Sequence, residues 1–302
     1  MKRSEKNDFV AKLKDEFESS SSIIVTHYSN LNVKETDELR KAMRENDAKF
    51  KVTKNRLTKL ALANTQYETI SDNLGRFRFD VTELETTVHY GISTRYQGVL
   101  YNQSIDTSVS GQNEILLKVY DSSTNDNIVH ASSVSVLFAN ADTASQVISV
   151  LEIIALENAS NHTYVPGPDP MSLLRFGLPA GAQDLTVDTS LSGADYIQVD
   201  RGFALLTSLP PGEHEVLISY LLPYLGTETT VTKSLPYGAG RFRILAPSEV
   251  LTLTSTQFPN IQKEIIGERE YQLIEATSIT KGTKVSLDLR NLPESSLVHQ
   301  MS

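Results

Sequence analysis

The stretch at residues 57–81, LTKLALANTQYETISDNLGRFRFDV, contains the change of pattern that decides the fold. Before its turn at residues 72–75, apolar residues recur at the three- and four-residue spacing of amphipathic helices. After that turn, short runs of β-branched and aromatic residues alternate with turn residues, which is typical of strands. The sequence therefore predicts two pieces of different origin that meet near residue 74. A length of 302 residues fits about two domains.

Composition places the chain among ordinary globular proteins, with 39% hydrophobic and 22% charged residues. The absence of cysteine excludes disulfides, zinc-thiolate sites and thiol catalysis. No apolar run approaches the roughly 20 residues that a membrane-spanning helix needs. The first 22 residues are charged at every turn and lack the apolar core of a signal peptide, so the expected location is cytoplasmic. The β-rich piece alone is also compatible with descent from an exported protein.

The net charge of -9 is unevenly distributed between the two pieces. Residues 1–74 contain 14 lysines and arginines against 12 acidic residues, whereas the remainder contains 14 against 25. The first piece is therefore weakly basic and the second strongly acidic. Only the first piece is expected to approach a polyanion without electrostatic repulsion.

The first piece shows an α-β-α-β-α order. Residues 5–18 place Phe9, Leu13 and Phe17 at helical spacing, and the serine run that follows ends this helix. A β-branched run at residues 23–28 predicts a buried strand, and Asn32 begins a second helix through residue 46 as its N-cap. Residues 50–53 predict a second strand and residues 57–63 a third helix. The strand–helix–strand unit implies a parallel pair with a right-handed crossover.

The second piece is predicted to be mostly antiparallel β-structure, which makes the whole chain α+β. The apolar run at residues 143–155 fits either a helix or a long strand, and its periodicity leaves both open. We interpret residues 1–74 as a truncated α/β unit, 75–140 as a partial β-sandwich and 141–302 as a further β-sandwich. The expected strands, each bounded by turn residues, lie at 76–81, 86–92, 96–101, 114–121, 131–139, 184–188, 196–200, 202–207, 214–224, 229–235, 241–247, 250–255, 271–276 and 284–289.

Several stretches of the first piece resemble one family in the same order. They are KRSEK at 2–6, SSIIVTHYSNLNVKETDELRKAMREN at 21–46 and KFKVTKNRLTKLA at 49–61. Together they resemble the N-terminal part of bacterial large-subunit ribosomal protein ten, the stalk-base protein. Asn30, Asn32 and Arg56 depart from the family pattern. The second half of the family's globular domain has no counterpart after residue 74.

The resemblance implies a structural, rRNA-binding role at the base of the ribosomal stalk. The implied partners are 23S rRNA and ribosomal protein eleven, and stalk dimers are not expected because the helix that binds them has no counterpart here. Phosphate contacts and RNA shape would carry recognition. A solvated charged face is the alternative interpretation of the same residues. The candidate rRNA-binding residues are Lys2, Arg3, Lys6, Lys51, Lys54, Asn55 and Arg56.

The stretch GRFRF at residues 75–79 resembles the end of a motif in carboxypeptidase-regulatory-like β-sandwich repeats. The remainder loosely resembles envelope proteins with such repeats, which suggests an alternative function as a cell-envelope interaction or carrier module whose N-terminus has been replaced. Two modules truncated at one shared point differ from ordinary fusions of complete domains. We therefore interpret the whole chain as a chimera of two modules.

The sequence predicts no enzyme, cofactor or metal site. None of the six histidines forms a zinc-binding pair, and no nucleophile elbow or phosphate loop is present. The acids Asp184, Asp188, Asp195 and Asp200 lie around strands, where calcium binding and simple solvation are both conceivable and solvation is favoured.

Overall fold

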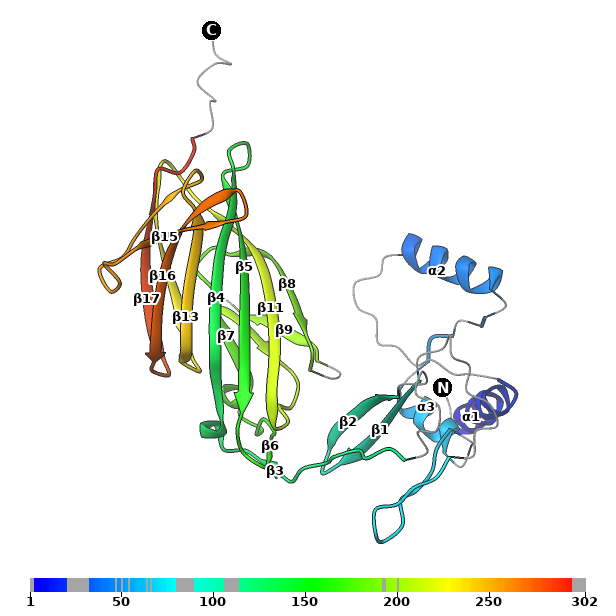
Figure 1. Cartoon of the computed structure of the whole chain (residues 1–302). Helices are drawn as coiled ribbons and strands as arrows, with labels where there is room; N and C mark the ends of the chain where they lie inside the picture. Colours follow the sequence, from blue (N-terminus) through cyan, green and yellow to red (C-terminus); the bar gives the residue numbers. More distant parts are fainter. Residues whose placement is uncertain are drawn as a thin grey trace. The chain divides into compact units, whose positions relative to one another are not determined.

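The computed structural model describes residues 3–20, 33–46, 48–49, 51–53, 55–63, 65, 67–79, 90–105, 114–191, 194–199 and 201–294. The chain divides into two compact units, residues 1–89 with 107–110 and residues 90–106 with 111–302 (Figure 1). The predicted seam near residue 74 falls inside the first unit. No helix among the described residues has the length and apolar character needed to cross a bilayer.

The first unit contains three helices, α1 (Arg3–Glu18), α2 (Val33–Glu45) and α3 (Asn55–Leu62), which confirms the three predicted helices. The end of α1 follows from its serines, because the hydroxyls of Ser19 and Ser20 donate hydrogen bonds to the carbonyl of Glu16 at 3.0 and 2.6 Å. Such side chains compete with the backbone ladder and favour helix ends.

The predicted strands of the first unit have a different outcome. Residues 51–53 belong to no strand, and the predicted strand at residues 23–28 lies outside the described residues, as does Phe50. A strand needs a hydrogen-bonded neighbour, and no described residue of this unit supplies one. The expected parallel pair is therefore absent from the described part of the unit, whose regular secondary structure is helical.

A turn follows the helices at residues 72–76. The Asp72 carboxylate accepts hydrogen bonds from the backbone N–H groups of Arg76 and then Leu74, both at 2.9 Å, and these bonds lower the pKa of Asp72. Gly75 adopts a φ of 77°, a conformation that glycine reaches at little cost. Residues 76–79, predicted as the start of a strand, are not in one, because no described strand lies beside them.

The second unit begins with a hairpin of β1 (Tyr90–Tyr96) and β2 (Val99–Ile105). Its two-residue turn, Gln97-Gly98, has positive φ at both positions (47° and 83°), as the favoured hairpin turns require. The buried hydroxyl of Tyr101 lies 2.7 Å from the Thr163 hydroxyl, which attaches the hairpin to the rest of the unit.

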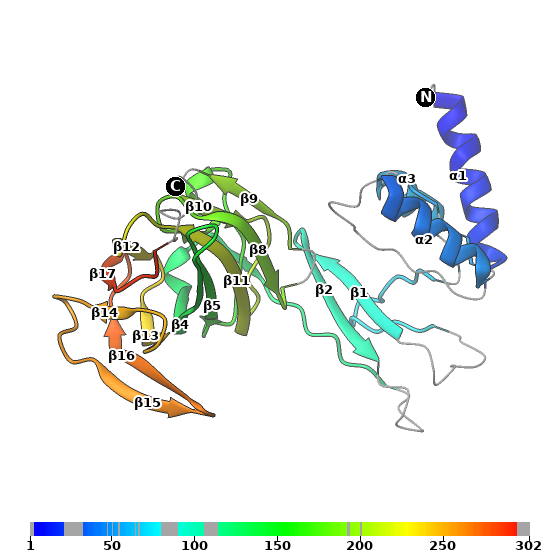
Figure 2. The same ribbon diagram turned by 90° about the horizontal axis from the view of Figure 1, so that it is seen from above.

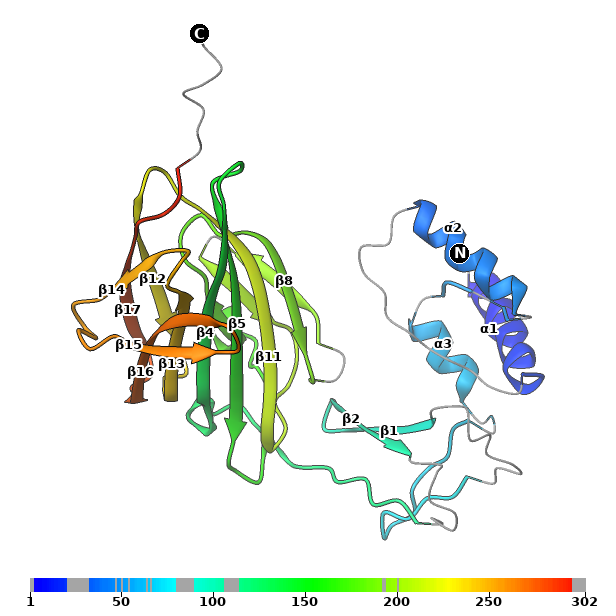
Figure 3. The ribbon, with the colours of Figure 1, turned by 45° about the horizontal axis from the view of Figure 1, so that its top comes forward.

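A seven-stranded sheet forms the main layer of the second unit (Figures 1 and 3). Its neighbouring strands pair antiparallel except β4 and β13, which are parallel. The predicted mostly antiparallel β-structure is thus confirmed. In order, the strands are β15 (Gln262–Ile266), β16 (Arg269–Ile279), β13 (Ala239–Pro247), β4 (Val129–Asp142), β5 (Val147–Asn158), β11 (Gly212–Pro223) and β8 (Gln183–Thr189).

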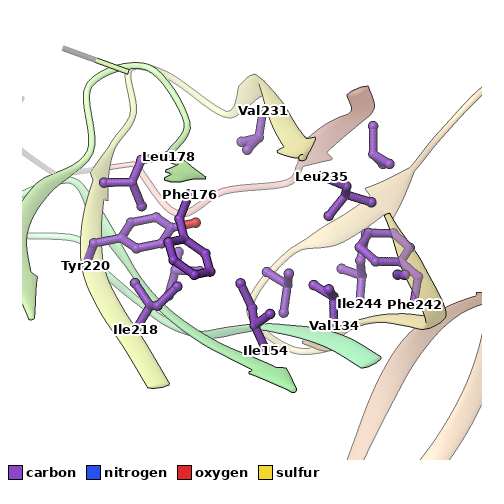
Figure 4. Packing of buried hydrophobic residues seen from close by; sticks show 14 of the residues in the cluster. Val134, Ile154, Phe176, Leu178, Ile218, Tyr220, Val231, Leu235, Phe242 and Ile244 are labelled. Atoms are coloured by element: carbon purple, nitrogen blue, oxygen red, sulfur yellow. The ribbon is translucent and has the colours of Figure 1, made fainter. Parts of the chain in front are cut away.

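Smaller sheets accompany this layer, and Figure 2 shows β12, β14 and β17 grouped near β13 and β16. Buried residues of large and small sheets form one hydrophobic cluster, part of which is drawn in Figure 4. The remaining elements are β12 (Glu228–Leu235), β17 (Thr283–Arg290), β14 (Thr252–Thr254), β7 (Leu174–Gly177), β10 (Gly202–Leu205), β9 (Tyr196–Val199), β3 (Ser122–Ser123), β6 (Thr163–Tyr164) and the 3₁₀ helices η1 (Asp126–Ile128) and η2 (Pro170–Ser172).

Three details of the β-rich region bear on the sequence interpretation. Residue 140 lies within β4, and β4 pairs along its length with β5, so the expected domain boundary near residue 140 does not divide this sheet. The ambiguous run at residues 143–155 is a turn followed by β5. Residues 114–121, predicted as a strand, have no strand partner, and Leu116 is 76% exposed.

Candidate nucleic-acid interface

Packing of α1 against α3 fixes the orientation of the candidate basic residues. Leu13 and Phe17 of α1 and Ala61 of α3 form a small buried cluster, with Phe9 and Leu62 packed at its margin. Ala61 is fully buried, which allows the two helix backbones to approach closely. This contact directs the opposite face of α3 toward solvent.

The exposed face of α3 carries two cations. Arg56 and Lys59 are exposed and lie three residues apart, which makes them neighbours on the helix surface. The helix has no acidic residue to neutralise them. Lys59 was not among the predicted residues, although its three-residue spacing from Arg56 is a signal readable from the sequence. Asn55 is the first residue of α3, and its side chain lies outside the described part.

Lys51 is engaged within the protein. Its Nζ lies 2.7 and 2.8 Å from the two carboxylate oxygens of Glu16 and 5.7 Å from the ring centroid of Phe9. Both side chains of the ion pair are substantially exposed, so the pair contributes at most about 1 kcal/mol. A phosphate that contacts Lys51 would compete with Glu16 for the same ammonium group.

For most of the other predicted residues, the structure describes the side chain only in part or not at all. Lys6 is exposed on α1, and Arg3 is the first residue of that helix, with a side chain outside the described part. Lys2 and Lys54 lie outside the described residues. The structure therefore groups Arg56 with the newly identified Lys59 on one helix face, and it shows no direct contact between this pair and Lys6.

The cations of α2 differ from those of α3, because acids lie one turn away. Lys34 pairs with Glu38 at 3.9 Å and Lys41 with Glu45 at 3.9 Å, and all four side chains are exposed. Arg40 likewise reaches an aspartate on the same helix. Local neutralisation of this kind makes α2 a weaker polyanion-binding surface than α3.

In the β-rich unit, two of the acids considered for calcium act as local backbone acceptors. The carboxylates of Asp188 and Asp195 each accept a hydrogen bond from the next residue's N–H at 2.8 Å. Asp200 lies outside the described residues. No group of three or more histidine, aspartate or glutamate side chains in the described ranges is arranged to hold a metal ion.

The sequence patterns did not predict a buried charged cluster that the structure shows in the β-rich region. Glu152 of β5 is fully buried, and its carboxylate oxygens lie 2.5 Å from Lys233 Nζ and 2.7 Å from the Tyr220 hydroxyl. Lys233 also donates to the Gly177 carbonyl at 2.7 Å. The readable signal was the strand alternation, which puts Glu152 on the same face as the apolar Val150.

Comparison with known proteins separates the two parts of the chain. A sequence model of the family described as Ribosomal protein L10 matches residues 1–77. Large ribosomal subunit protein uL10 of Rhodospirillum rubrum is 47% identical over 72 residues, which are 24% of this chain and 42% of that protein. The uL10 proteins of Paramagnetospirillum magneticum and Pelagibacter ubique are 50% and 38% identical over 72 residues, covering 42% and 43% of their lengths and 24% of this chain.

The chain therefore spans less than half the length of these relatives. Its N-terminal segment is related to the ribosomal protein L10 family, and a distinct β-rich region follows, which fits a chimera. A solved structure from Legionella pneumophila, described as a nutrient binding protein, matches 57% of this chain and 70% of its own at 10% identity and a TM-score of 0.34. A TM-score this low supports no conclusion about the β-rich region.

Proposed function

We propose that the N-terminal segment attaches the chain to 23S rRNA at the base of the ribosomal stalk, beside ribosomal protein eleven. The observation that carries this proposal is the similarity of residues 1–77 to the L10 family. The exposed cations Arg56 and Lys59 on an acid-free helix are consistent with it. The role is structural, with no chemical step.

Binding would follow from phosphate contacts together with the shape of folded RNA. Arg56 and Lys59 would each neutralise a phosphate and release condensed counterions. Lys6 would extend the contact along α1, and Lys51 would take part only by leaving Glu16. The piece after residue 74, with 25 acidic against 14 basic residues, opposes any approach of its own to RNA.

Binding of the full chain to a 23S rRNA stalk-base fragment at a series of salt concentrations tests the proposal. We expect affinity to fall steeply with salt. Replacing Arg56 and Lys59 together by alanine should weaken binding and reduce the salt slope by about 0.7 to 0.9 for each lost phosphate contact. Affinity that is absent at low salt, or independent of salt, would refute the rRNA-binding role.

A matched control removes charge without touching α3. Lys118 is an exposed cation of the second unit, in a segment without strand structure. Lys118→Ala changes the net charge by the same amount as either single α3 substitution, so it should leave both affinity and salt slope unchanged. Equal losses for Lys118→Ala and Arg56→Ala would favour the solvated-face interpretation of α3.

We further propose that the β-rich region serves as a separate interaction or carrier module, in line with its loose resemblance to envelope proteins. The supporting observation is its own hydrophobic cluster, whose fully buried members include Phe242 and Ile218. None of the described residues of the first unit belongs to this cluster. A fragment covering residues 90–302 is expected to give a strand-rich circular dichroism spectrum. A helical or unfolded spectrum would contradict a separate module.

A further inference from the structure

We propose that Lys233 and Glu152 condense to an intramolecular isopeptide bond that joins β12 to β5 across the β-rich core. The Lys233 nitrogen lies 2.5 Å from one carboxylate oxygen of Glu152, and the two side chains are 4% and 0% exposed. The residues are 81 positions apart and belong to different sheets. The bond would be a covalent modification of the core, independent of the proposed role of the first unit.

Buried apolar side chains flank the pair, both along its own strands and across from them. Glu152 stands opposite Val136 of β4 and Ile218 of β11 in the strand register, and both are buried. Lys233 alternates with Val231 and Leu235, which are also buried. An ion pair loses most of its solvation in such a layer, so conversion to an uncharged product removes an energetic cost.

Two further contacts arrange the pair for reaction. The Gly177 carbonyl accepts a hydrogen bond from Lys233 Nζ at 2.7 Å and so holds the nitrogen in place. The Tyr220 hydroxyl donates to Glu152 Oε1 at 2.7 Å. In Figure 4 the ring of Tyr220 lies near Phe176 and Leu178 within the apolar core.

The state of the tyrosine suits a donor role. Burial, and then the neighbouring Glu152 carboxylate, raises the pKa of Tyr220 well above its ordinary value, so the hydroxyl keeps its proton. A fixed donor at this oxygen stabilises the negative charge that develops there during attack on the carboxyl carbon.

The reaction balances without any co-reactant. A proton passes from the Lys233 ammonium group to Glu152 Oε2, which leaves a neutral amine beside a carboxylic acid. The amine lone pair attacks Cδ, and negative charge moves to Oε1. A second proton then passes from Nζ to the hydroxyl on Oε2, the Cδ–Oε2 bond breaks, and water leaves as the Oε1 carbonyl re-forms.

Proximity and exclusion of water favour this condensation. The amine and the carboxyl group are held in contact by two sheets, which replaces a bimolecular encounter by an intramolecular one. A desolvated lysine is also a better nucleophile than a solvated one. A cavity of about 10 Å³ that Lys233 and Phe176 help to line offers space for about one water molecule.

Mass spectrometry of the denatured full chain tests the bond directly. The expected intact mass is lower than the sequence mass by one water molecule, and a protease digest should contain a branched peptide that joins the segments carrying residues 152 and 233. Lys233→Met cannot form the bond. Its intact mass should therefore equal the mass calculated from the variant's own sequence, whether or not the variant folds. A wild-type chain of full sequence mass would overturn the proposal, as would a deficit that persists in Lys233→Met.

Two comparisons separate the role of the site from that of proximity alone. Lys263 and Glu270 form an ion pair at 2.7 Å, but both side chains are exposed, so their peptides should be unlinked. A link there would overturn the burial argument. Tyr220→Phe removes the donor to Oε1 and should leave a larger unlinked fraction than wild type at matched times after synthesis. Equally complete linkage in this variant would overturn the role assigned to Tyr220.

Discussion

Two glycines show how one backbone conformation has different consequences at different sites. Gly238 and Gly226 have nearly equal φ values, 67° and 68°. A Cβ at Gly238 would lie 2.4 Å from the Ile279 carbonyl oxygen, whereas a Cβ at Gly226 meets nothing within 4 Å. Only at Gly238 must the neighbouring backbone move to accept a side chain.

The matched pair gives a prediction for unfolding free energies. Gly226→Ala should cost about 1 kcal/mol, because only the left-handed conformation is penalised. Gly238→Ala should cost about 3 kcal/mol or more, because a clash with the Ile279 carbonyl is added. Urea unfolding followed by the circular dichroism signal of the strands measures the unfolding free energy of both variants. Similar losses for the two variants would contradict the close approach at Gly238.

The turn between β4 and β5 yields a pH prediction. The Ser145 hydroxyl and then the Ala144 N–H donate to Asp142, and these bonds hold the pKa of Asp142 below its ordinary value of 3.8. A lowered folded-state pKa stabilises the turn above pH 3.8, and this contribution is lost as the pH falls through the folded value. In an NMR titration, Ser145→Ala should move the Asp142 midpoint up toward 3.8, whereas Thr143→Ala should not. An unchanged midpoint in Ser145→Ala would argue against that hydrogen bond.

Residue patterns predicted part of the candidate sites and left part unseen. Lys51 and Arg56 came from the family resemblance, and Lys59 was overlooked although it lies one turn from Arg56. Glu152 and Lys233 each interrupt an apolar alternation, which marks them as buried polar positions. Their mutual contact joins strands from different sheets, and no local pattern encodes that pairing.

Helices were predicted well because their signal is local, whereas strands depend on partners. The spacing of Phe9, Leu13 and Phe17 defines α1 without knowledge of any other segment. Residues 114–121 have strand composition but no neighbouring strand, so they remain irregular. β15 was missed for the opposite reason, because all its residues are exposed and show no alternation, and it forms by pairing with β16.

The contact between α1 and α3 can be tested at the level of these elements. Leu13→Ala removes a 3% exposed side chain from a cluster with few members and should cost about 2 to 4 kcal/mol. A unit with so small a core should lose most of its helical circular dichroism. Leu60 of α3 is 55% exposed, so Leu60→Ala should cost less than about 0.5 kcal/mol. Equal effects would show that α3 does not pack as described.

At the scale of the whole molecule, the two hydrophobic clusters share no residue. Leu13, Phe17 and Ala61 belong to the first, and all members of the second lie between residues 129 and 292. In the described residues, no strand from before the turn at residues 72–75 joins a sheet that follows it. Stability should therefore be divided between two cooperative units.

Thermal unfolding of the full chain should show this division as separate losses of helical and strand signal. Leu13→Ala should lower the midpoint temperature of the helical transition only. Phe242→Ala removes a fully buried ring from the second cluster and should lower only the strand transition, by a loss of about 3 to 5 kcal/mol in that unit. Each variant serves as the control for the other, because cores without shared side chains transmit no packing defect. If either substitution shifts both transitions together, the chain folds as one cooperative body and the two-module interpretation is wrong.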